Sequence, residues 1–449
     1  MSRRPAPRTA PATATRRPAR APRPSVKPRP RSARVARQEA FAPPVHAPSL
    51  EALLGGLTPV AFLADHWEQR VYHLSRGQPD FYAPLLPRAE IDHLIASALA
   101  LDPTSVELLP RARPGDAGRP LDAQRLQEGY DAGNTLRVNA AHRFLGPLRQ
   151  LRGHLEQGLG ALVNVNLYCA PARSETAQVH FDRHCFVLQV SGRRKWSLSP
   201  RETDLPLEYV PPFRFEDLED SRGFRTPRFQ PAGSDGPTEH FVLEAGDLLY
   251  LPRGHVHESR ADGTHSVHLT LGFKTLTYVD CLASALYQLA HREPALRRSL
   301  PPGFLLGGTV QEEVHEELRR LGERLPQALD VEAAVTDIAR AFLHKRGQLT
   351  GMTLGAEDDA AHLGLQDRVE RRAGQLLHYS EGAGKARLQF GQRTVSVPAD
   401  FGEALRFIQR TPRFQVRALP GPLDDEGRLA LVGRLTREGL LYALRQEED

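Results

Sequence analysis

The spacing of hydrophobic and polar residues changes twice along the chain. Apolar residues recur at helical spacing within 50–54, 59–67, 90–100 and 145–159, and a short strand is expected at 71–74. From about residue 163, short runs rich in Val, Leu, Phe and Tyr alternate with Gly, Pro or charged turns. The runs that predict strands are 163–169, 186–190, 195–198, 241–243, 247–251 and 266–273. Such a series indicates an all-β barrel or jelly roll.

Two further regions follow these predicted strands. Residues 280–343 return to helical spacing. Segments 386–390 and 393–398 predict a hairpin, and helices are expected at 401–409 and 426–441, a combination typical of a small winged-helix module. The predicted organisation is a basic tail at 1–46, a barrel domain at 47–274, a helical region at 275–360 and a winged-helix-like domain at 361–449.

The net charge of +5 is unevenly distributed. Residues 1–38 contain eleven Arg, one Lys and no acidic residue, which is +12 and leaves −7 for residues 39–449. Prolines spread among the tail's charges oppose a helix or a core, so we expect the tail to be disordered. Its charge favours non-specific contact with RNA or the ribosome. A transit peptide and a tail without a specific role are the alternatives.

Membrane and secretory signals are not visible in the sequence. No apolar run approaches the length of a membrane span, and no apolar region follows the basic residues at the amino terminus. Cys169, Cys185 and Cys281 are odd in number and form no C-x-x-C, which argues against a disulfide framework or a thiolate zinc site. We therefore expect a cytoplasmic protein with three small, buried thiols.

Candidate metal ligands occur in two segments. His180-Phe181-Asp182 places a His and a carboxylate at positions i and i+2 of a strand, which face the same way. Two His and one carboxylate can hold ferrous iron while leaving coordination positions open. The short motif alone is weak evidence, because the chain contains 18 His. A second His is available after residue 250, where spacing alone does not choose between His255 and His257.

Several sequence blocks together resemble the JmjC-type ribosomal oxygenases, a cupin-like branch of the Fe(II)- and 2-oxoglutarate-dependent oxygenases. The blocks are Asn166-Leu167-Tyr168 with Pro171, followed by His180-Phe181-Asp182; Phe186-Val187-Leu188-Gln189-Val190 with Gly192-x-Arg194-x-Trp196; and Gly246-Asp247-x-Leu249-Tyr250-x-Pro252-Arg253-Gly254-x-x-His257, continued by His265-Ser266-x-His268. Phe62-x-x-x-His66-Trp67-Glu68 looks like the family's amino-terminal signature.

The resemblance implies a fold and a set of site residues. It implies a double-stranded β-helix (jelly-roll cupin) core flanked by helices, then a helical dimerisation region and a winged-helix-like α+β end. His257, rather than His255, completes the iron triad with His180 and Asp182. Arg194 is placed where the family binds the distal carboxylate of 2-oxoglutarate. The remaining residues implied in the cosubstrate pocket are Asn166, Tyr168, Ser266 and His268, for which ordinary polar strand residues are the alternative.

The implied reaction is hydroxylation of a protein side chain by O2, with Arg or His of a ribosomal protein as the expected target and a homodimer as the expected assembly. The net charge of −7 on residues 39–449 suits a basic protein substrate. The loop between Asp182 and Phe186 is one residue shorter than the family's, so substrate choice can differ there. The alternatives are the same chemistry on a small molecule or biosynthetic peptide, and a non-catalytic cupin with a winged helix that regulates by binding nucleic acid.

Overall fold

The computed structural model of the 449-residue chain is described for residues 47–109, 121–174, 180–181, 183–199, 205, 238–346, 355–372 and 375–444. Side chains at positions 180, 181 and 346 are not described. The predicted tail at 1–46 and Asp182 therefore lie outside the described residues.

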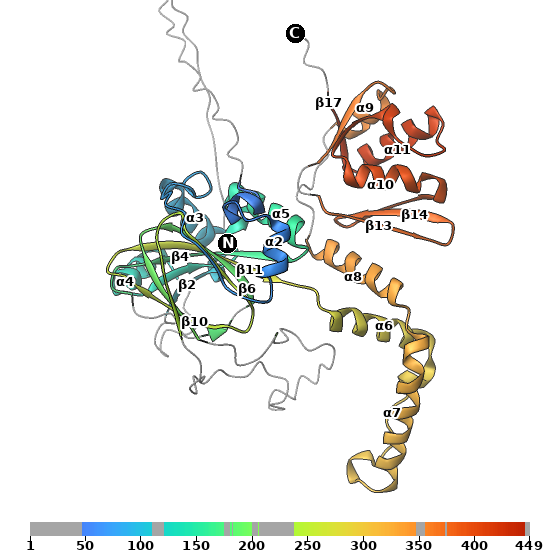
Figure 1. The fold of residues 1–449 in the computed structure, drawn as a ribbon, viewed down its shortest axis with the longest axis horizontal. Coiled ribbons are helices and arrows are strands. Elements are labelled where there is room, and N and C mark those ends of the chain that lie inside the picture. The colour runs from blue at the N-terminus through green and yellow to red at the C-terminus, as the bar shows by residue number, and fades with distance from the viewer. Residues whose placement is uncertain are drawn as a thin grey trace, which may run out of the picture. The chain divides into compact units, whose positions relative to one another are not determined.

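Helices precede the β-rich part of the chain (Figure 1). They are α1 (Leu50–Leu54), α2 (Pro59–Asp65), α3 (Arg88–Leu101), α4 (Ala123–Asp131) and α5 (Gly146–Leu159). The side chain of Thr58 accepts a hydrogen bond from the backbone of Ala61, and Pro59 occupies the first turn of α2, where a missing N–H costs nothing. These local signals explain why α2 begins where the sequence predicts.

Two antiparallel sheets form the β-rich core of the amino-terminal part. The larger sheet runs β1 (Tyr72–Leu74), β9 (Leu248–Leu251), β6 (His184–Ser191), β11 (Ser266–Lys274), β4 (Leu162–Ala170), β3 (Thr135–Val138), β2 (Val106–Leu109). The smaller runs β5 (His180–Phe181), β10 (Val256–Ala261), β7 (Arg194–Ser199), β8 (Glu239–Leu243). The predicted antiparallel β architecture is confirmed, although β2, β3, β10 and α4 were not predicted.

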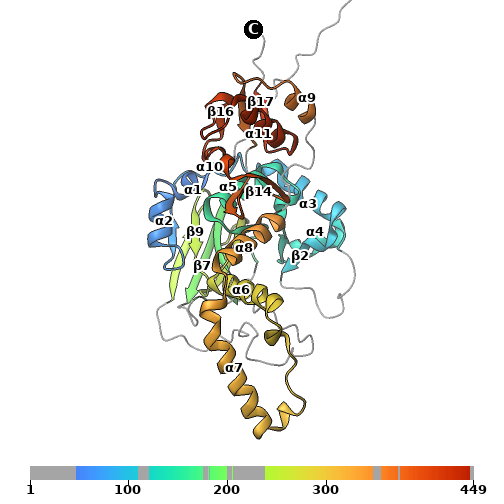
Figure 2. The same ribbon diagram turned by 90° about the vertical axis from the view of Figure 1, so that its right-hand side faces the viewer.

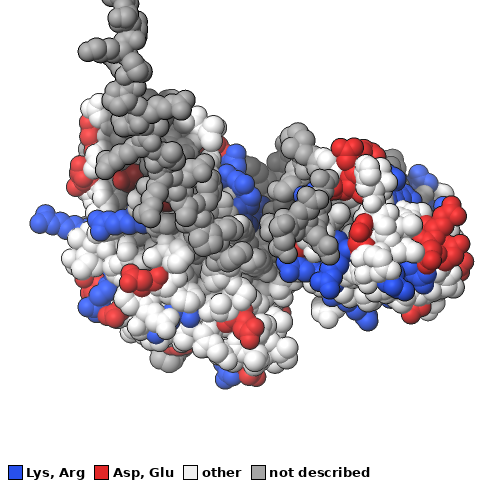
Figure 3. Space-filling model, turned by 90° about the horizontal axis from the view of Figure 1, so that it is seen from above, with Lys and Arg blue, Asp and Glu red and all other residues white. Residues whose placement is uncertain are grey.

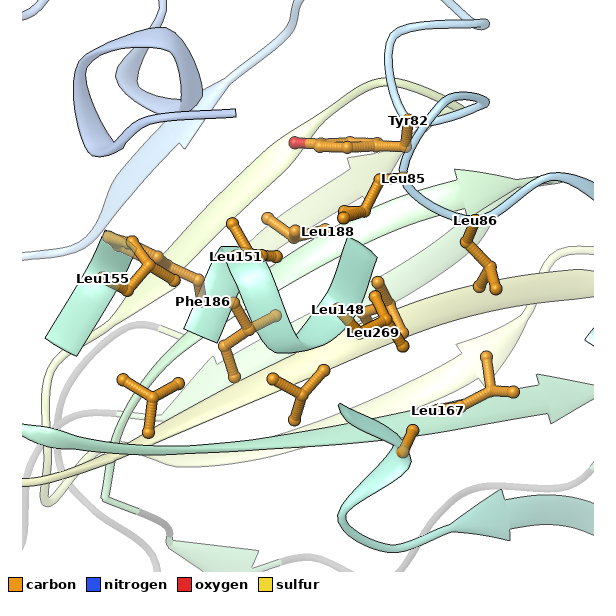
Figure 4. Packing of buried hydrophobic residues seen from close by; sticks show 14 of the residues in the cluster. Tyr82, Leu85, Leu86, Leu148, Leu151, Leu155, Leu167, Phe186, Leu188 and Leu269 are labelled. Atoms are coloured by element: carbon orange, nitrogen blue, oxygen red, sulfur yellow. The ribbon is translucent and has the colours of Figure 1, made fainter. Parts of the chain in front are cut away.

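The main hydrophobic core lies between α5 and the larger sheet, as Figure 4 shows. Leu148, Leu151 and Leu155 recur at spacings of three and four along α5, so they share one face of the helix. That face belongs to the same hydrophobic cluster as Phe186 and Leu188 of β6. Because side chains alternate along a strand, the intervening residues of β6 point to the other face, toward the smaller sheet.

Helices return after β11. They are α6 (Tyr278–Arg292), α7 (Thr309–Ala328) and α8 (Val331–Arg346). A capping box between Thr277 and Asp280 starts α6. Gln288 of α6 donates a hydrogen bond to Asp337 of α8 at 2.6 Å, and Figure 2 shows the two helices side by side. The predicted return to helices is confirmed.

The carboxy-terminal part has its own core. It contains α9 (Ala356–Ala361), β12 (Arg368–Arg371), β13 (Leu377–Gly382), β14 (Lys385–Phe390), β15 (Arg393–Pro398), α10 (Gly402–Arg410), β16 (Arg413–Gln415), α11 (Asp425–Arg437) and β17 (Leu441–Leu444). The predicted hairpin is confirmed as β14 and β15. The predicted end of the last helix at 441 is wrong. Gly439 adopts a left-handed φ of 77°, which stops the helix and lets the chain turn into β17.

Candidate active site

A cavity lies between the two sheets, and one of its walls is built from β7 and β10 of the smaller sheet. Arg194 and Trp196 are two residues apart on β7, and His257 and Ser259 are two residues apart on β10. The register places Trp196 opposite Ser259, so these four side chains face the same side of the sheet. The larger sheet and its edge supply the opposite wall through Leu109, Thr135, Tyr168, Cys185, Val187, His268 and Thr270.

The structure brings two of the three predicted metal ligands into register. His180 of β5 is the antiparallel partner of His257 in β10. The unpredicted strand β10 is therefore what carries the distant His back beside the H-x-D motif. Asp182 follows β5 but lies outside the described residues. Within the described parts of the chain, no group of three His, Cys, Asp or Glu is placed to hold a metal ion.

His257 has the environment of a metal-binding imidazole. It is buried, and its ring centroid lies 5.9 Å from that of Trp196. Its Nδ1 lies 3.2 Å from the backbone oxygen of His255. Since a carbonyl oxygen only accepts, this contact favours a proton on Nδ1 and leaves the lone pair on Nε2, as a metal ligand requires. His255 precedes the strand and does not line the cavity. The donor types predicted for this site, two imidazoles and one carboxylate, are those that suit ferrous iron.

Arg194 is the most unusual residue of the cavity. It is only 1% exposed. Its Nε donates to the hydroxyl of Ser259 at 2.9 Å, and one terminal nitrogen lies 3.3 Å from the Ser259 carbonyl. The other terminal nitrogen, Nη1, has no hydrogen-bond partner among the described residues, and none of their carboxylates pairs with the guanidinium. Burial lowers the pKa of Arg194 to about 10.

The turn before Arg194 depends on glycine. Gly192 has a left-handed φ of 68°, and a Cβ atom added there would overlap the carbonyl oxygen of His265. The predicted Gly-x-Arg element is thus a tight turn between β6 and β7 that directs the guanidinium inward. Arg193 and Lys195, which flank Arg194, are half exposed and pair with Asp262 on the surface.

Tyr168 and His268 form a stacked pair in the cavity. Their ring centroids lie 4.8 Å apart with the planes 3° from parallel. Burial, followed by the positive charge of Arg194, holds the pKa of His268 well below its usual value. His268 is therefore a neutral ring at neutral pH, and its Nδ1 has no hydrogen-bond partner within the described structure. Both residues lie where the sequence predicts cosubstrate contacts.

The other two predicted pocket residues do not line the cavity. The Asn166 side-chain oxygen accepts hydrogen bonds from the backbone of Ala140 at 3.0 Å and from Asn164 at 2.8 Å. The Ser266 hydroxyl accepts from Gln189 at 3.0 Å. Asn166 and Ser266 thus match the alternative interpretation, in which polar strand residues are satisfied by ordinary hydrogen bonds. Their role in cosubstrate binding stays a prediction.

Sequence reasoning missed Ser259 and Thr270 as cavity residues. Ser259 is the partner of Arg194, and its position two residues after His257 on one strand was the available signal. Cys185 was predicted to be a small buried thiol; it is buried, but it also lines the cavity. Edge residues Leu109 and Thr135 belong to strands that the hydrophobic pattern did not reveal.

Comparison with known proteins agrees with this geometry. Residues 144–281 match the family model described as JmjC domain. This segment is similar to JmjC domains. It contains β4 to β11 and thus every cavity residue named above except Leu109 and Thr135. The match confirms the resemblance predicted from the sequence blocks, and it supports the cupin-type fold and the predicted enzyme class, a 2-oxoglutarate-dependent dioxygenase.

Curated relatives resemble most of the chain. Ribosomal oxygenase 1 of Danio rerio is 26% identical over 433 residues, covering 85% of this chain and 77% of the relative. The bifunctional lysine-specific demethylase and histidyl-hydroxylase NO66 of Drosophila mojavensis is 28% identical over 320 residues, covering 66% of this chain but only 34% of the relative. The chain thus spans only a part of that longer relative.

A solved structure supports the fold. The X-ray structure of Escherichia coli ycfD aligns with a TM-score of 0.51 and 17% identity, over 86% of this chain and 98% of the other. Another structure of that protein, in complex with cobalt and 2-oxoglutarate, aligns with a TM-score of 0.44. No helix in the described ranges is long and apolar enough to cross a membrane.

Proposed function

We propose that this JmjC-domain protein uses Fe(II) and 2-oxoglutarate to hydroxylate a protein side chain, an Arg or His of a ribosomal protein. The observation that carries the proposal is Arg194, a buried cation whose Nη1 meets no described hydrogen-bond acceptor. Burying a charge without an anion is costly, so such a residue indicates a site for an anionic ligand. A dicarboxylate bound between Arg194 and a metal at His257 would satisfy both ends of the cavity.

The residues have distinct proposed roles. His180, Asp182 and His257 would hold the iron, which supplies oxygen activation coupled to conversion of 2-oxoglutarate to succinate and carbon dioxide. Arg194 binds the distal carboxylate, and Ser259 orients the guanidinium through its hydroxyl. The stacked Tyr168 and His268, together with Trp196, exclude water from this end of the cavity. No protein nucleophile is needed for this chemistry.

A basic protein substrate is supported by charge and by the relatives' names. Residues 39–449 carry −7, which would attract a basic protein and steer its approach. Two of the relatives are named as a ribosomal oxygenase and a histidyl-hydroxylase. On the face shown in Figure 3, acidic and basic side chains are interspersed, so this face is not a continuous basic surface of the kind that favours nucleic acid.

We further propose a homodimer formed through the helical region at 275–360. Tyr278, Leu282 and Leu286 lie four residues apart on α6, share one face and are exposed. Helix α7 has no buried residue although Leu318 and other apolar residues recur along it. A second copy of the chain would cover such apolar surface. The region at 361–449, with its β14–β15 hairpin and packed helices, is proposed to be winged-helix-like.

The proposal is tested by incubating the full-length protein with ribosomal proteins, Fe(II) and 2-oxoglutarate. Succinate is measured and the ribosomal proteins are examined by peptide mass spectrometry. The expected result is succinate formation together with a gain of one oxygen on an Arg or His residue. His180→Ala should abolish both signals. Iron-dependent succinate formation that no ribosomal protein stimulates would refute the substrate assignment, and would favour a small molecule or biosynthetic peptide.

A further inference from the structure

The turn that follows α2 reaches both chain segments that carry the predicted metal ligands. This turn contains Trp67 and Glu68, which belong to the sequence signature that has no role in the cavity itself. Glu68 Oε1 lies 2.9 Å from an Arg253 terminal nitrogen and 3.4 Å from His184 Nε2. One carboxylate oxygen therefore contacts two residues that are 69 positions apart in the chain.

Each partner of Glu68 is close in sequence to a predicted ligand. His184 begins β6, two residues after Asp182. Arg253 lies in the Pro-Arg-Gly turn that leads into β10 and His257. The two partners also contact each other, since the backbone N–H of Arg253 donates to His184 Nδ1 at 3.3 Å. A displacement of either segment relative to the other would stretch this set of contacts.

Aromatic packing and backbone geometry hold the turn in place. Trp67 stacks on His184 with ring centroids 4.5 Å apart and on Tyr250 at 5.7 Å. The Tyr250 hydroxyl lies 3.0 Å from His184 Nδ1 and accepts a hydrogen bond from the Glu68 backbone at 3.0 Å. Glu68 has a left-handed φ of 62°, which costs a non-glycine residue about 1 kcal/mol and persists only where surrounding contacts enforce it.

Charge makes Glu68 difficult to replace. Arg253 is only 6% exposed, and in the described structure Glu68 is the carboxylate that pairs with it. Removing the partner of a buried charge leaves that charge uncompensated, so the Arg253 turn would have to move toward water. Because that turn leads into the strand carrying His257, its movement would change the distance between the ligand-bearing segments.

We propose that Glu68 is a positioning residue of the metal centre, which sets the spacing between the segment that ends in His184 and the segment that delivers His257. The inference rests on the proposed function, because it assumes that these two segments hold the metal. The Phe-x-x-x-His-Trp-Glu signature thereby gains a structural role, since its last two residues connect the two segments outside the cavity.

The test is titration of the full-length protein with cobalt(II), without 2-oxoglutarate, followed by visible absorption of the bound ion. Loss of a group that orients metal ligands typically weakens metal affinity roughly 10- to 100-fold. We expect Glu68→Gln, which has nearly the same shape, to raise the apparent Kd for cobalt(II) by that factor and to alter the absorption bands. Glu51→Gln, an exposed site on α1, is the matched control and should leave both unchanged.

The outcomes separate this inference from the proposed function. The metal site itself would be refuted if the wild-type protein did not bind cobalt(II), or if His257→Ala kept the absorption of bound cobalt(II). A normal wild-type titration with an unchanged Kd and spectrum in folded Glu68→Gln would overturn the positioning role, even if the thermal midpoint fell. If Glu68→Gln does not fold, Arg253→Lys is titrated instead; it keeps the charge but loses the guanidinium geometry, and the same criteria apply.

Discussion

Replacement of Arg194 by methionine should make the ligand-free protein more stable and the enzyme much worse at using 2-oxoglutarate. Methionine fills a similar apolar volume but carries no charge. Burial lowers the pKa of Arg194 to about 10, which disfavours the buried charged form by roughly 3 kcal/mol at about 1.4 kcal/mol per pKa unit. The hydrogen bonds to Ser259 offset this by about 1 kcal/mol each.

The net gain in unfolding free energy for Arg194→Met is thus about 1 kcal/mol, or about 2–4 °C in thermal midpoint. The same change removes the cation that would pair with a buried carboxylate, a loss of roughly 3 kcal/mol, which corresponds to about a hundredfold increase in KM for 2-oxoglutarate. Thermal unfolding without metal or cosubstrate gives the first quantity, and succinate formation at varied 2-oxoglutarate gives the second.

The matched control is Arg193→Met, which removes a neighbouring guanidinium that is half exposed and pairs with surface carboxylates. It should leave the KM for 2-oxoglutarate unchanged, because a surface ion pair contributes little and does not contact the cavity. A KM for 2-oxoglutarate within about twofold of the wild type in folded Arg194→Met would refute the role of this residue in binding the cosubstrate. A large fall in ligand-free stability would contradict the inference that the buried charge is held for function.

Three further predictions follow from the site and its supports. Ser259→Ala should raise the KM for 2-oxoglutarate about tenfold with little change in kcat, because Arg194 loses the hydroxyl that orients it. A tenfold fall in kcat with an unchanged KM, measured by succinate formation, would contradict this. Gly192→Ala should lower the thermal midpoint by several degrees, since its Cβ overlaps a carbonyl oxygen, and an unchanged midpoint would show that the turn adapts. Burial lowers the pKa of His142 to about 4. The stability that its neutral form contributes is therefore complete above about pH 6.5 and is lost as the pH falls toward 4. His142→Gln should reduce this pH dependence of the unfolding free energy in urea, and an unaltered dependence would exclude His142 as a cause.

Strand parity and local turn signals account for the parts of the site that were predictable. His180 and Asp182 are two residues apart, and Gly192 precedes Arg194 at a turn that only glycine accommodates. The pairing of His180 with His257 depends on β10, which was missed because the Pro-Arg-Gly turn ends the preceding apolar run and the strand itself reads as a polar sequence. Sequence order alone does not reveal which strands become neighbours.

The contacts that support the site were least accessible from sequence. The spacing of Ser259 from His257 could place both residues on one face of a strand, but it did not reveal that Ser259 contacts Arg194. Glu68 lies in the turn after α2, far from the cavity residues in sequence. Its contact with Arg253 forms because this turn packs against the ends of β6 and β9. Hydrophobic periodicity locates elements, whereas such polar contacts depend on tertiary packing.

The proposed metal centre is tested most directly by release of carbon dioxide from 2-oxoglutarate labelled at its C1 carboxylate, compared among the wild type, His257→Ala and His255→Ala. We expect iron-dependent release by the wild type, loss of release in His257→Ala and substantial retention in His255→Ala. His257 lines the cavity and is the strand partner of His180, whereas His255 precedes the strand and does not line the cavity. Release that survives in His257→Ala but disappears in folded His255→Ala would contradict the proposed metal centre.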